Sequence, residues 1–335
     1  MINVLVIGAG TMGSVHSSAY KGMDNVNLVG IVDIRKEKAE AAAGGTVPTF
    51  TSFEDAISEL KDVDVVDVCL PTYLHKEFVL KGANLGKHIV CEKPLARSLE
   101  DAREMIDYCN EQNVKLFVGH VLRFFPEYVQ AKSVIESGKI GRPGVVRTFR
   151  GGVFPTAWND WYADFKNSGG LVLDMIIHDI DFLRWCFGEV ERVYAKSLLG
   201  RGYARKDYNL LTLRFKNGVI AHVEGSWAHE GFSMAFEIAG DKGIIDYNSS
   251  KETPIVLRAQ SAQQVTSGVA VPESPMKNNP YFYELEHYMH CIETDETPRV
   301  TAEDAYKAVE ISLAALKSIK TGQPVLLNPV YIEEV

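Results

Sequence analysis

The sequence predicts two domains of different class: an α/β domain built on a doubly wound parallel sheet, and an α+β domain with a largely antiparallel sheet. The chain has 335 residues, which suits roughly two domains of about 150 residues each. Up to Val118, short β-branched runs alternate with helical ones, whereas after Arg123 strands mostly follow one another. Alternation is typical of βαβ units, and consecutive strands with tight turns are typical of an antiparallel sheet. We therefore expect domains over residues 1–122 and 123–335.

The composition excludes several classes of protein. Hydrophobic residues make up 46% of the chain and charged residues 24%, a balance typical of globular rather than disordered proteins. The 35 Lys and Arg against 44 Asp and Glu give a formal net charge of -9. This charge repels polyanions, so we expect no nucleic-acid partner. The five cysteines include no CxxC pair, which favours reduced thiols over a disulfide framework.

The N-terminal segment and the hydropathy pattern bear on localisation. Met1–Gly8 is apolar and strand-like, without the basic leader of a secretory signal. Apolar runs stay shorter than the ~20 residues that a membrane-spanning helix needs. We therefore expect a cytoplasmic protein with no membrane partner.

The first domain is expected to alternate strands and helices. Its strands are predicted over residues 2–7, 28–32, 63–70, 88–91 and 115–118, and its helices over residues 12–21, 36–43, 74–85 and 99–111. The strands are continuously apolar, as in a parallel sheet that is covered on both faces.

The second domain is expected to be dominated by strands. Helices are predicted over residues 126–136, 170–187, 281–294 and 302–321, strands over residues 145–153, 190–199, 209–215, 219–227, 233–239 and 243–247, and a loop over residues 261–279. Asn217-Gly218 predicts a hairpin because this pair supports turns with positive φ. Thr301 and Asp304 predict a capping box at the start of the last helix. The last two helices could pack back on the first domain.

The strongest local motif is Gly8-Ala9-Gly10-Thr11-Met12-Gly13, which matches the GxGxxG fingerprint between a strand and a helix. Gly8 permits a tight turn, Gly10 lets backbone N–H groups approach a pyrophosphate, and the helix N-terminus favours its negative charge. Asp33 follows Gly13 by 20 positions, the spacing at which a carboxylate accepts hydrogen bonds from the adenosine ribose. The pattern predicts a dinucleotide-binding Rossmann domain; the structural alternative is a strand-to-helix turn without a nucleotide.

Asp33 favours NAD over NADP because its carboxylate would repel a 2′-phosphate. Arg35 lies two residues later and could compensate in part, so NADP stays open as a cofactor.

Three motifs together resemble the Gfo/Idh/MocA oxidoreductases, the group of glucose–fructose oxidoreductase and inositol dehydrogenase. They are the fingerprint at Gly8–Gly13, Glu92-Lys93-Pro94 after a predicted strand, and the run from Asp174 to Asp181, which reads DMIIHDID. The motifs occur in the family's order and span nearly the whole chain. The resemblance implies an NAD(P)-dependent dehydrogenase that acts on CH–OH groups of polyols, sugars or sugar derivatives.

The resemblance also implies the catalytic residues. It implies that Lys93 reaches the nicotinamide and the substrate oxygen, where a cation would stabilise a developing alkoxide. It implies that Asp174, His178 and Asp181 contact the polyol or act as the acid/base pair. Their spacing also predicts one face of a helix, and an imidazole with an ordinary pKa near 6.5 suits proton exchange at neutral pH. The structural alternatives are a solvated lysine, and a surface or core histidine beside solvated acids.

Further contacts follow from the resemblance and from an aromatic cluster. The family's cofactor contacts would fall on Leu70, Pro71, Thr72, His75, Glu92 and Lys93, although the family often has a Thr-Pro-Asn-like turn where this chain has Leu70-Pro71-Thr72. Substrate contacts would include Arg123 and Tyr283, with a solvated Arg123 as the alternative. Trp161 supplies either an apolar face for a sugar or a seal between domains. His75 could equally be structural.

Metal binding is not expected. His287, His290 and Cys291 lie close together on a predicted helix, but one ligand pair does not make a closed tetrahedral site.

Other functions remain open at this point. A nucleotide-sugar 3-dehydrogenase would need a basic pocket, to which Arg123, Lys166, Arg201 and Arg205 could contribute. A reductase of keto or anhydro sugars would keep the family and reverse the reaction. An NAD-binding regulatory sensor without turnover would have no need of Lys93, Asp174 and His178. The resemblance implies a homodimer or homotetramer that packs through the broad sheet of the second domain.

Overall fold

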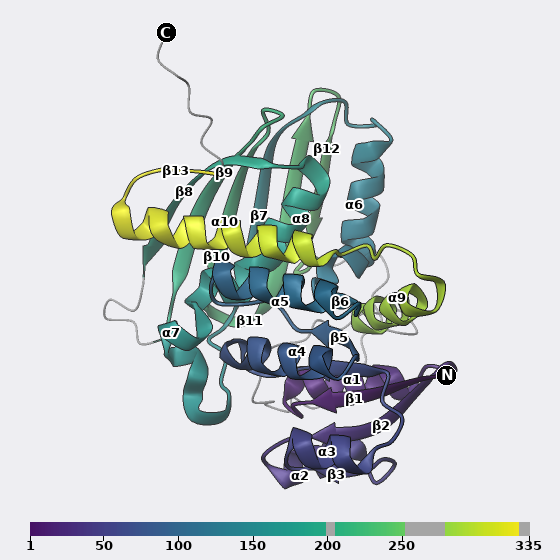
Figure 1. The fold of residues 1–335 in the computed structure, drawn as a ribbon. Helices are drawn as coiled ribbons and strands as arrows, with labels where there is room; N and C mark the ends of the chain where they lie inside the picture. The colour runs from purple at the N-terminus through teal and green to yellow at the C-terminus, as the bar shows by residue number, and fades with distance from the viewer. Residues whose placement is uncertain (199–204, 252–278, 328–335) are drawn as a thin grey trace. The chain divides into compact units, whose positions relative to one another are not determined.

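The structure is a computed structural model that describes residues 1–198, 205–251 and 279–327. Leu199, Arg201 and most of the loop predicted over residues 261–279 lie outside the described residues. The chain divides into two compact units (Figure 1). Unit 1 comprises the described residues of Met1–Phe125, Lys166–Ser168 and Glu273–Val309, and unit 2 comprises those of Pro126–Phe165, Gly169–Pro272 and Glu310–Val335. Unit 1 thus adds to the first stretch of the chain a segment that includes residues 280–294, the first of the two helices that the sequence analysis allowed to pack back on the first domain.

Unit 1 contains a six-stranded parallel sheet in the order β3-β2-β1-β4-β5-β6. The strands are β1 (Ile2–Ile7), β2 (Val26–Val32), β3 (Thr49–Phe50), β4 (Val65–Val68), β5 (His88–Cys91) and β6 (Leu116–Val118). The order runs outward from β1 in both directions, so the sheet is doubly wound as predicted. The glycine-rich turn after β1 therefore lies where the strand order reverses, the position at which open α/β sheets bind ligands.

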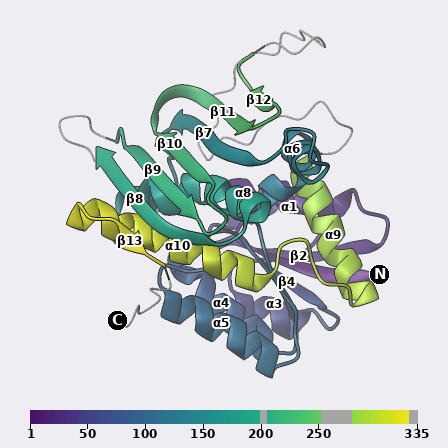
Figure 2. The ribbon, with the colours of Figure 1, turned by 90° about the horizontal axis from the view of Figure 1, so that it is seen from above.

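Helices cover both faces of this sheet. They are α1 (Thr11–Lys21), α2 (Lys36–Ala43), α3 (Phe53–Glu59), α4 (His75–Asn84), α5 (Leu99–Glu111) and α9 (Pro280–Thr294), with short 3₁₀ segments η1 (Thr72–Leu74) and η2 (Val121–Phe124). Figure 2 shows α1 and α9 on one face and α3, α4 and α5 on the other. A core of buried side chains from β1, β2, α1 and α9 includes Val4, Leu28, Tyr20 and Tyr288.

Local sequence explains where several of these helices begin. Ser52, Ser98 and Asn279 each accept a hydrogen bond from a backbone N–H three residues later, at the starts of α3, α5 and α9. Such caps satisfy amides that have no partner within the helix. The prediction missed β3 and α3, because two strand residues and seven helical residues are too few to show a period.

Unit 2 contains a seven-stranded sheet in the order β12-β11-β7-β10-β9-β8-β13. The strands are β7 (Pro143–Val153), β8 (Val190–Leu198), β9 (Tyr208–Phe215), β10 (Ile220–Ser226), β11 (Ala228–Gly240), β12 (Ile244–Asn248) and β13 (Val325–Leu326). Only β7 and β10 pair in parallel; the other neighbours are antiparallel. This confirms the largely antiparallel sheet that the sequence predicted.

The remaining helical segments are α6 (Pro126–Glu136), η3 (Trp158–Ala163), α7 (Phe165–Ser168), a π-helical segment η4 (Val172–Ile176), α8 (Ile177–Phe187) and α10 (Ala302–Thr321). Figure 2 shows α8 across one face of the seven-stranded sheet. The predicted hairpin between β9 and β10 is confirmed, with Gly218 at φ +96°. The capping box is confirmed too: the Thr301 N–H donates to Asp304 Oδ2 at 3.1 Å, and the Asp304 N–H donates to Thr301 Oγ1 at 3.0 Å.

A buried ion pair joins β7 to α8 within unit 2. Arg150 Nε donates to Asp179 Oδ2 at 2.6 Å, and the two side chains are 3% and 1% exposed. Arg150 Nη2 also donates to the Tyr128 hydroxyl at 3.3 Å. Burial lowers the pKa of Arg150, but the charge of Asp179 outweighs that effect and the pKa is raised. Arg150 therefore keeps its positive charge in the folded protein.

Candidate active site

The loop between β1 and α1 has the geometry of a dinucleotide-binding turn. Gly8 has φ +94°, and a Cβ there would lie 2.4 Å from the Cys69 carbonyl oxygen. A Cβ on Gly13 would lie 1.7 Å from the Gly8 carbonyl oxygen, so only glycine fits at either position. At Gly10, a Cβ would have no described atom within 4 Å. Gly10 is the N-cap of α1 and lacks a side-chain cap, so the first amides of α1 can donate hydrogen bonds to the pyrophosphate of a dinucleotide.

Asp33 lies at the carboxyl end of β2 and is 6% exposed. Its carboxylate accepts the Ala9 N–H at 2.8 Å and the Arg35 Nε and Nη2 donors at 3.0 Å each. Burial opposes ionisation, but these hydrogen bonds from Arg35 and Ala9 lower the pKa of Asp33. An ionised acid and an adjacent arginine thus stand beside the glycine turn, and their contacts with a ribose remain predictions.

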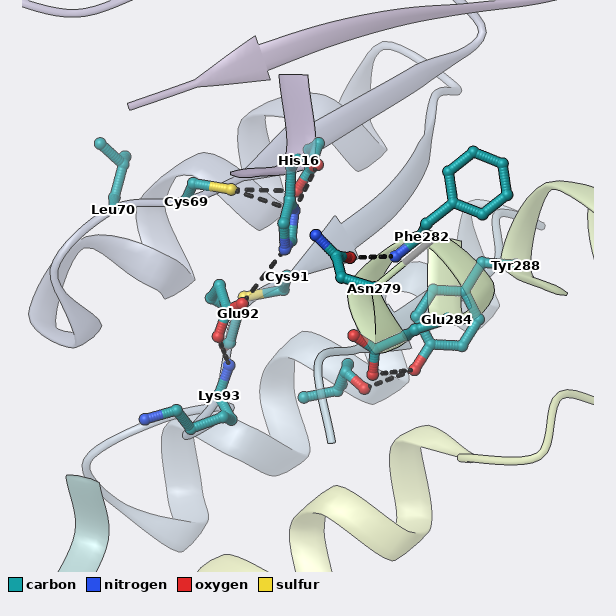
Figure 3. Close-up of polar contacts among 12 residues, drawn as sticks. His16, Cys69, Leu70, Cys91, Glu92, Lys93, Asn279, Phe282, Glu284 and Tyr288 are labelled. Atoms are coloured by element: carbon teal, nitrogen blue, oxygen red, sulfur yellow. Dashed lines mark hydrogen bonds and ion pairs between the residues drawn. The ribbon is translucent and has the colours of Figure 1, made fainter. Parts of the chain in front are cut away.

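Lys93 lies two residues after the end of β5, in a turn held by buried neighbours. The Lys93 N–H donates to Glu92 Oε2 at 3.0 Å, and the Lys93 side chain extends away from Glu92 (Figure 3). The ring nitrogens of His75 lie 2.9 Å from the carbonyl oxygens of Pro94 and Leu70. His75 therefore ties the turn after β5 to the turn after β4. Burial lowers the pKa of His75 against the opposing effect of these carbonyl oxygens, and the ring has a structural role whether or not it contacts the cofactor. Thr72, in the same turn after β4, is buried.

The acidic and histidine motif of unit 2 lies on one continuous helical segment. Asp174 is in the π-helical turn η4 and is 7% exposed. His178 and Asp181 are in α8, where His178 is half-buried and Asp181 is fully buried. The spacing argument assumed a regular α-helix, and the wide turn at Asp174 corrects it. Such π-helical turns are rare in proteins, and those that occur are often found at functional sites.

The other predicted substrate residues have clear structural neighbours. Arg123 is not a solvated arginine: it is 2% exposed and donates to the Arg299 carbonyl oxygen at 2.8 Å and to Asp304 at 3.1 Å. Trp161 stacks on Tyr162 with ring centroids 3.9 Å apart. Tyr283, on α9, is half-buried and packs edge-on against Phe282. Lys93, Arg123 and Tyr283 belong to unit 1, while Trp161, Asp174, His178 and Asp181 belong to unit 2.

Sequence reasoning missed a buried polar cluster in unit 1, which we call the His16 cluster. It consists of His16, Tyr20, Asp67, Cys69 and Glu92. His16 Nδ1 lies 2.8 Å from Asp67 Oδ2, and its Nε2 lies 3.2 Å from Glu92 Oε1. The available signal was Asp67, an acid in the middle of a continuously apolar strand, because a charge there needs a partner. One side-chain atom each of His16, Asp67 and Cys69, of the kinds that can bind a metal ion, lie within 4.8 Å of one another.

A cavity of about 600 Å³ lies within unit 2. Phe165, Leu171, Val172, Asn209 and Leu316 are among the residues that line it. The lining does not include Asp174, His178 or Asp181.

The sheet order and the glycine turn of unit 1 define a dinucleotide-binding Rossmann domain, and unit 2 adds a mostly antiparallel sheet. Residues 2–120 match the model of an oxidoreductase family with an NAD-binding Rossmann fold, and residues 128–246 match the GFO/IDH/MocA C-terminal domain. The chain belongs to the Gfo/Idh/MocA oxidoreductase family, as its motifs indicated. It is an NAD-dependent oxidoreductase.

Similar proteins cover almost the whole chain. A myo-inositol 2-dehydrogenase of Thermotoga maritima is 31% identical over 97% of this chain and 98% of its own length. A 1,5-anhydro-D-fructose reductase of Ensifer adhaerens is 32% identical over 85% and 86%. The crystal structure of a probable dehydrogenase from Thermotoga maritima superposes with a TM-score of 0.82 at 31% identity, covering 97% of this chain and 98% of that one.

The structure also bears on membrane-spanning helices and on disulfides. In the described part of the chain, no helix combines the length and apolar character needed to cross a membrane. The five cysteines are all among the described residues and form no disulfide.

Proposed function

We propose that this protein transfers a hydride between NAD and a secondary hydroxyl or carbonyl carbon of a polyol, sugar or sugar derivative. The observation that carries the proposal is the set of groups present. A dinucleotide turn and a lysine at the carboxyl end of β5 are in unit 1, and two acids and a histidine are on one segment of unit 2. Relatives named for an inositol and for an anhydro sugar support this substrate class.

The residues divide the chemistry as follows. NAD supplies the hydride acceptor when it is bound. In the oxidation direction, His178 takes the hydroxyl proton, and Asp174 orients the imidazole and stabilises its charged form. Lys93 polarises the substrate oxygen and stabilises the developing alkoxide. In reduction, His178 returns the proton.

The remaining residues bind rather than react. Asp181 accepts hydrogen bonds from neighbouring hydroxyls of the substrate, and Trp161 supplies an apolar surface for the sugar ring. Arg123 and Tyr283 complete the proposed substrate set from unit 1. On the cofactor side, Thr11 and Met12 offer the first amides of α1, and Leu70, Pro71, Thr72, His75 and Glu92 form the turns beside the nicotinamide.

The test is to follow the absorbance of reduced nicotinamide while NAD, and then NADP, is offered with inositols, aldoses and UDP-sugars. We expect turnover with at least one polyol or sugar. Because Asp33 is ionised, calorimetry should give a lower Kd for NADH than for NADPH. Tighter binding of NADPH would show that Arg35 rather than Asp33 sets the preference. Binding of NADH without turnover of any compound would favour the regulatory sensor.

Two alternatives within the family use the same site. A reductase of keto or anhydro sugars would show its activity with NADH and a carbonyl substrate, and the similarity to 1,5-anhydro-D-fructose reductase favours it over the nucleotide-sugar 3-dehydrogenase. Of the basic residues considered for a diphosphate pocket, Arg205 pairs with Asp160, and Arg123 is committed to Asp304.

We also propose a cytoplasmic homodimer or homotetramer that assembles through the outer face of the seven-stranded sheet. β8 and β9 alternate buried and exposed residues, and Tyr194, Leu198, Tyr208 and Leu210 are 36%, 44%, 36% and 42% exposed on them. Exposed apolar residues on adjacent strands are typical of an interaction surface. Light scattering should give a multiple of 37.2 kDa, and Leu210→Glu should dissociate the assembly. Particles of only the monomer mass in the unmodified protein would contradict the proposal.

A further inference from the structure

The His16 cluster lies directly behind the turn that carries Lys93. His16 is on α1, Asp67 on β4 and Glu92 after β5, so the cluster connects three elements of the Rossmann domain (Figure 3). His16 and Asp67 are fully buried, and Glu92 is 6% exposed. The Tyr20 hydroxyl donates to Asp67 Oδ2 at 2.9 Å. The side chains of the His16 cluster therefore contact one another rather than solvent.

The geometry favours a positively charged His16. Each of its ring nitrogens faces a carboxylate oxygen, of Asp67 on one side and of Glu92 on the other. A neutral imidazole has one N–H and would present a lone pair to one of these carboxylates. An imidazolium donates to Asp67 through Nδ1 and presents a second positive N–H to Glu92 at ion-pair distance. Burial lowers the pKa of His16, but the charge of Asp67 and its hydrogen bond with Nδ1 act in the opposite direction, and the pKa is raised.

The Glu92 carboxylate contacts both His16 and the backbone of Lys93. Its Oε1 faces His16, and its Oε2 accepts the Lys93 N–H at 3.0 Å. Burial raises the pKa of Glu92, but the hydrogen bond and charge of His16 reverse that effect, so the pKa is lowered. On the other side, a Cβ at Gly119 would lie 3.3 Å from the Glu92 carboxyl carbon. The carboxylate therefore packs on a bare backbone, and a side chain at residue 119 would press on it.

We propose that His16 is a positioning residue: a buried imidazolium that holds the Glu92 carboxylate against the backbone of Lys93. This inference rests on the proposed role of Lys93. Reaction rates depend steeply on the position of catalytic groups, and a displacement of about 1 Å can cost on the order of 10²-fold. Loss of the His16 charge would leave Asp67 and Glu92 facing each other without a cation between them, and Glu92 would then protonate or move.

The thiol of Cys69 and the hydroxyl of Tyr20 add no charge beside His16. The Cys69 thiol lies 3.3 Å from His16 Nδ1, and burial raises its pKa, so it stays protonated. The ring of Tyr281 lies 6.4 Å from His16 between centroids. Burial and the nearby carboxylates also raise the pKa of Tyr20. Cys69 and Tyr20 are therefore neutral at physiological pH.

Glu284, on α9, is neutral as well. The Tyr288 hydroxyl lies 2.7 Å from the Val118 carbonyl oxygen and 3.2 Å from Glu284 Oε1. The Tyr288 hydroxyl donates to both acceptors, and the shorter bond goes to the carbonyl oxygen. Burial and the charge of Glu92 outweigh this hydrogen bond and raise the pKa of Glu284 well above its usual value. His16 is thus the cation between the two carboxylates of the cluster.

The test compares His16→Gln with His88→Gln. His88 is at the opposite end of β5 from Glu92, and its Nδ1 accepts the Lys115 N–H at 3.0 Å, an interaction that glutamine can retain. We expect His16→Gln to lower kcat by about 10²-fold, with the Kd for NADH within about threefold of the unmodified protein. His88→Gln should leave both unchanged.

The pH profile separates positioning from a merely structural defect. In His16→Gln, the pKa of Glu92 should rise because burial and Asp67 then act without a counter-charge. The acid limb of kcat should therefore shift to higher pH, and activity should recover in part toward pH 9. In Glu92→Gln this shift should be absent, although kcat is low. An unchanged kcat and pH profile in His16→Gln would overturn the proposal.

A third measurement does not depend on turnover. Histidine side-chain ¹⁵N NMR of the unmodified protein should show both nitrogens of His16 protonated from pH 6 to pH 9. In the Asp67→Asn/Glu92→Gln variant, which also serves if His16→Gln fails to fold, the ring should titrate within this range. A neutral His16, or a stoichiometric metal bound through Cys69, would overturn the inference. If Lys93→Ala keeps full activity while His16 is charged, the proposed function fails and the imidazolium stands.

Discussion

Lys93→Ala is expected to lower kcat by on the order of 10²–10⁴ while the Kd for NADH changes by less than about threefold. The two quantities separate because the residues that hold the dinucleotide differ from the lysine that acts on the substrate oxygen. The glycine turn and Asp33 lie at the ends of β1 and β2, whereas Lys93 follows β5. The expected result is a large loss of substrate oxidation while NADH still binds. Fluorescence titration measures the Kd for NADH.

Lys87→Ala provides the matched control. Lys87 immediately precedes β5, at the opposite end of the strand from Lys93, so the same change of charge there should leave kcat intact. Lys93→Arg keeps the positive charge but replaces a compact ammonium with a planar group, and it should restore only part of the activity. Full activity of Lys93→Ala would remove the lysine from the mechanism, while an equal loss in Lys87→Ala would point to net charge rather than to position.

The sequence predicted those features of the fold that depend on local pattern. The alternation of strands and helices led to the doubly wound sheet, Asn217-Gly218 marked the hairpin, and Thr301 with Asp304 marked the start of α10. Each of these signals lies within a few neighbouring residues. The placement of α9 with unit 1 has no such signal, because it depends on packing between α1 and residues such as Leu285 and Met289 more than 250 positions away.

The candidate site was predictable to the same degree. The glycine turn, Asp33 and the motif around His178 are contiguous patterns with a chemical meaning. The role of Arg123 was not predictable, since its partner Asp304 is 181 positions away. The His16 cluster draws on residues from three separate elements, and its only local trace was Asp67 within an apolar run. The π-helical turn at Asp174 was also not predictable, because hydrophobic periodicity over a few residues does not distinguish it from an α-helix.

Asp179→Ala is expected to lower the free energy of unfolding by about 3–5 kcal/mol. Asp179 lies within the run that carries Asp174 and His178, but its contacts are structural: it receives both the Nε and Nη2 donors of buried Arg150. Removing the carboxylate would leave a guanidinium that is always charged in a dry interior, with the Tyr128 hydroxyl as a remaining partner. Urea denaturation followed by circular dichroism measures the loss.

Burial, rather than the ion pair itself, accounts for this large cost, and two comparisons show why. Arg147 and Glu237 form the same kind of pair on β7 and β11, but their side chains are 62% and 42% exposed. Glu237→Ala should therefore cost only about 0–1 kcal/mol, because water replaces the lost partner. Arg150→Met/Asp179→Leu should recover most of the stability that Asp179→Ala loses, since no charge then remains buried. If the double variant is as unstable as the single one, packing around Asp179 rather than the orphaned charge determines the cost.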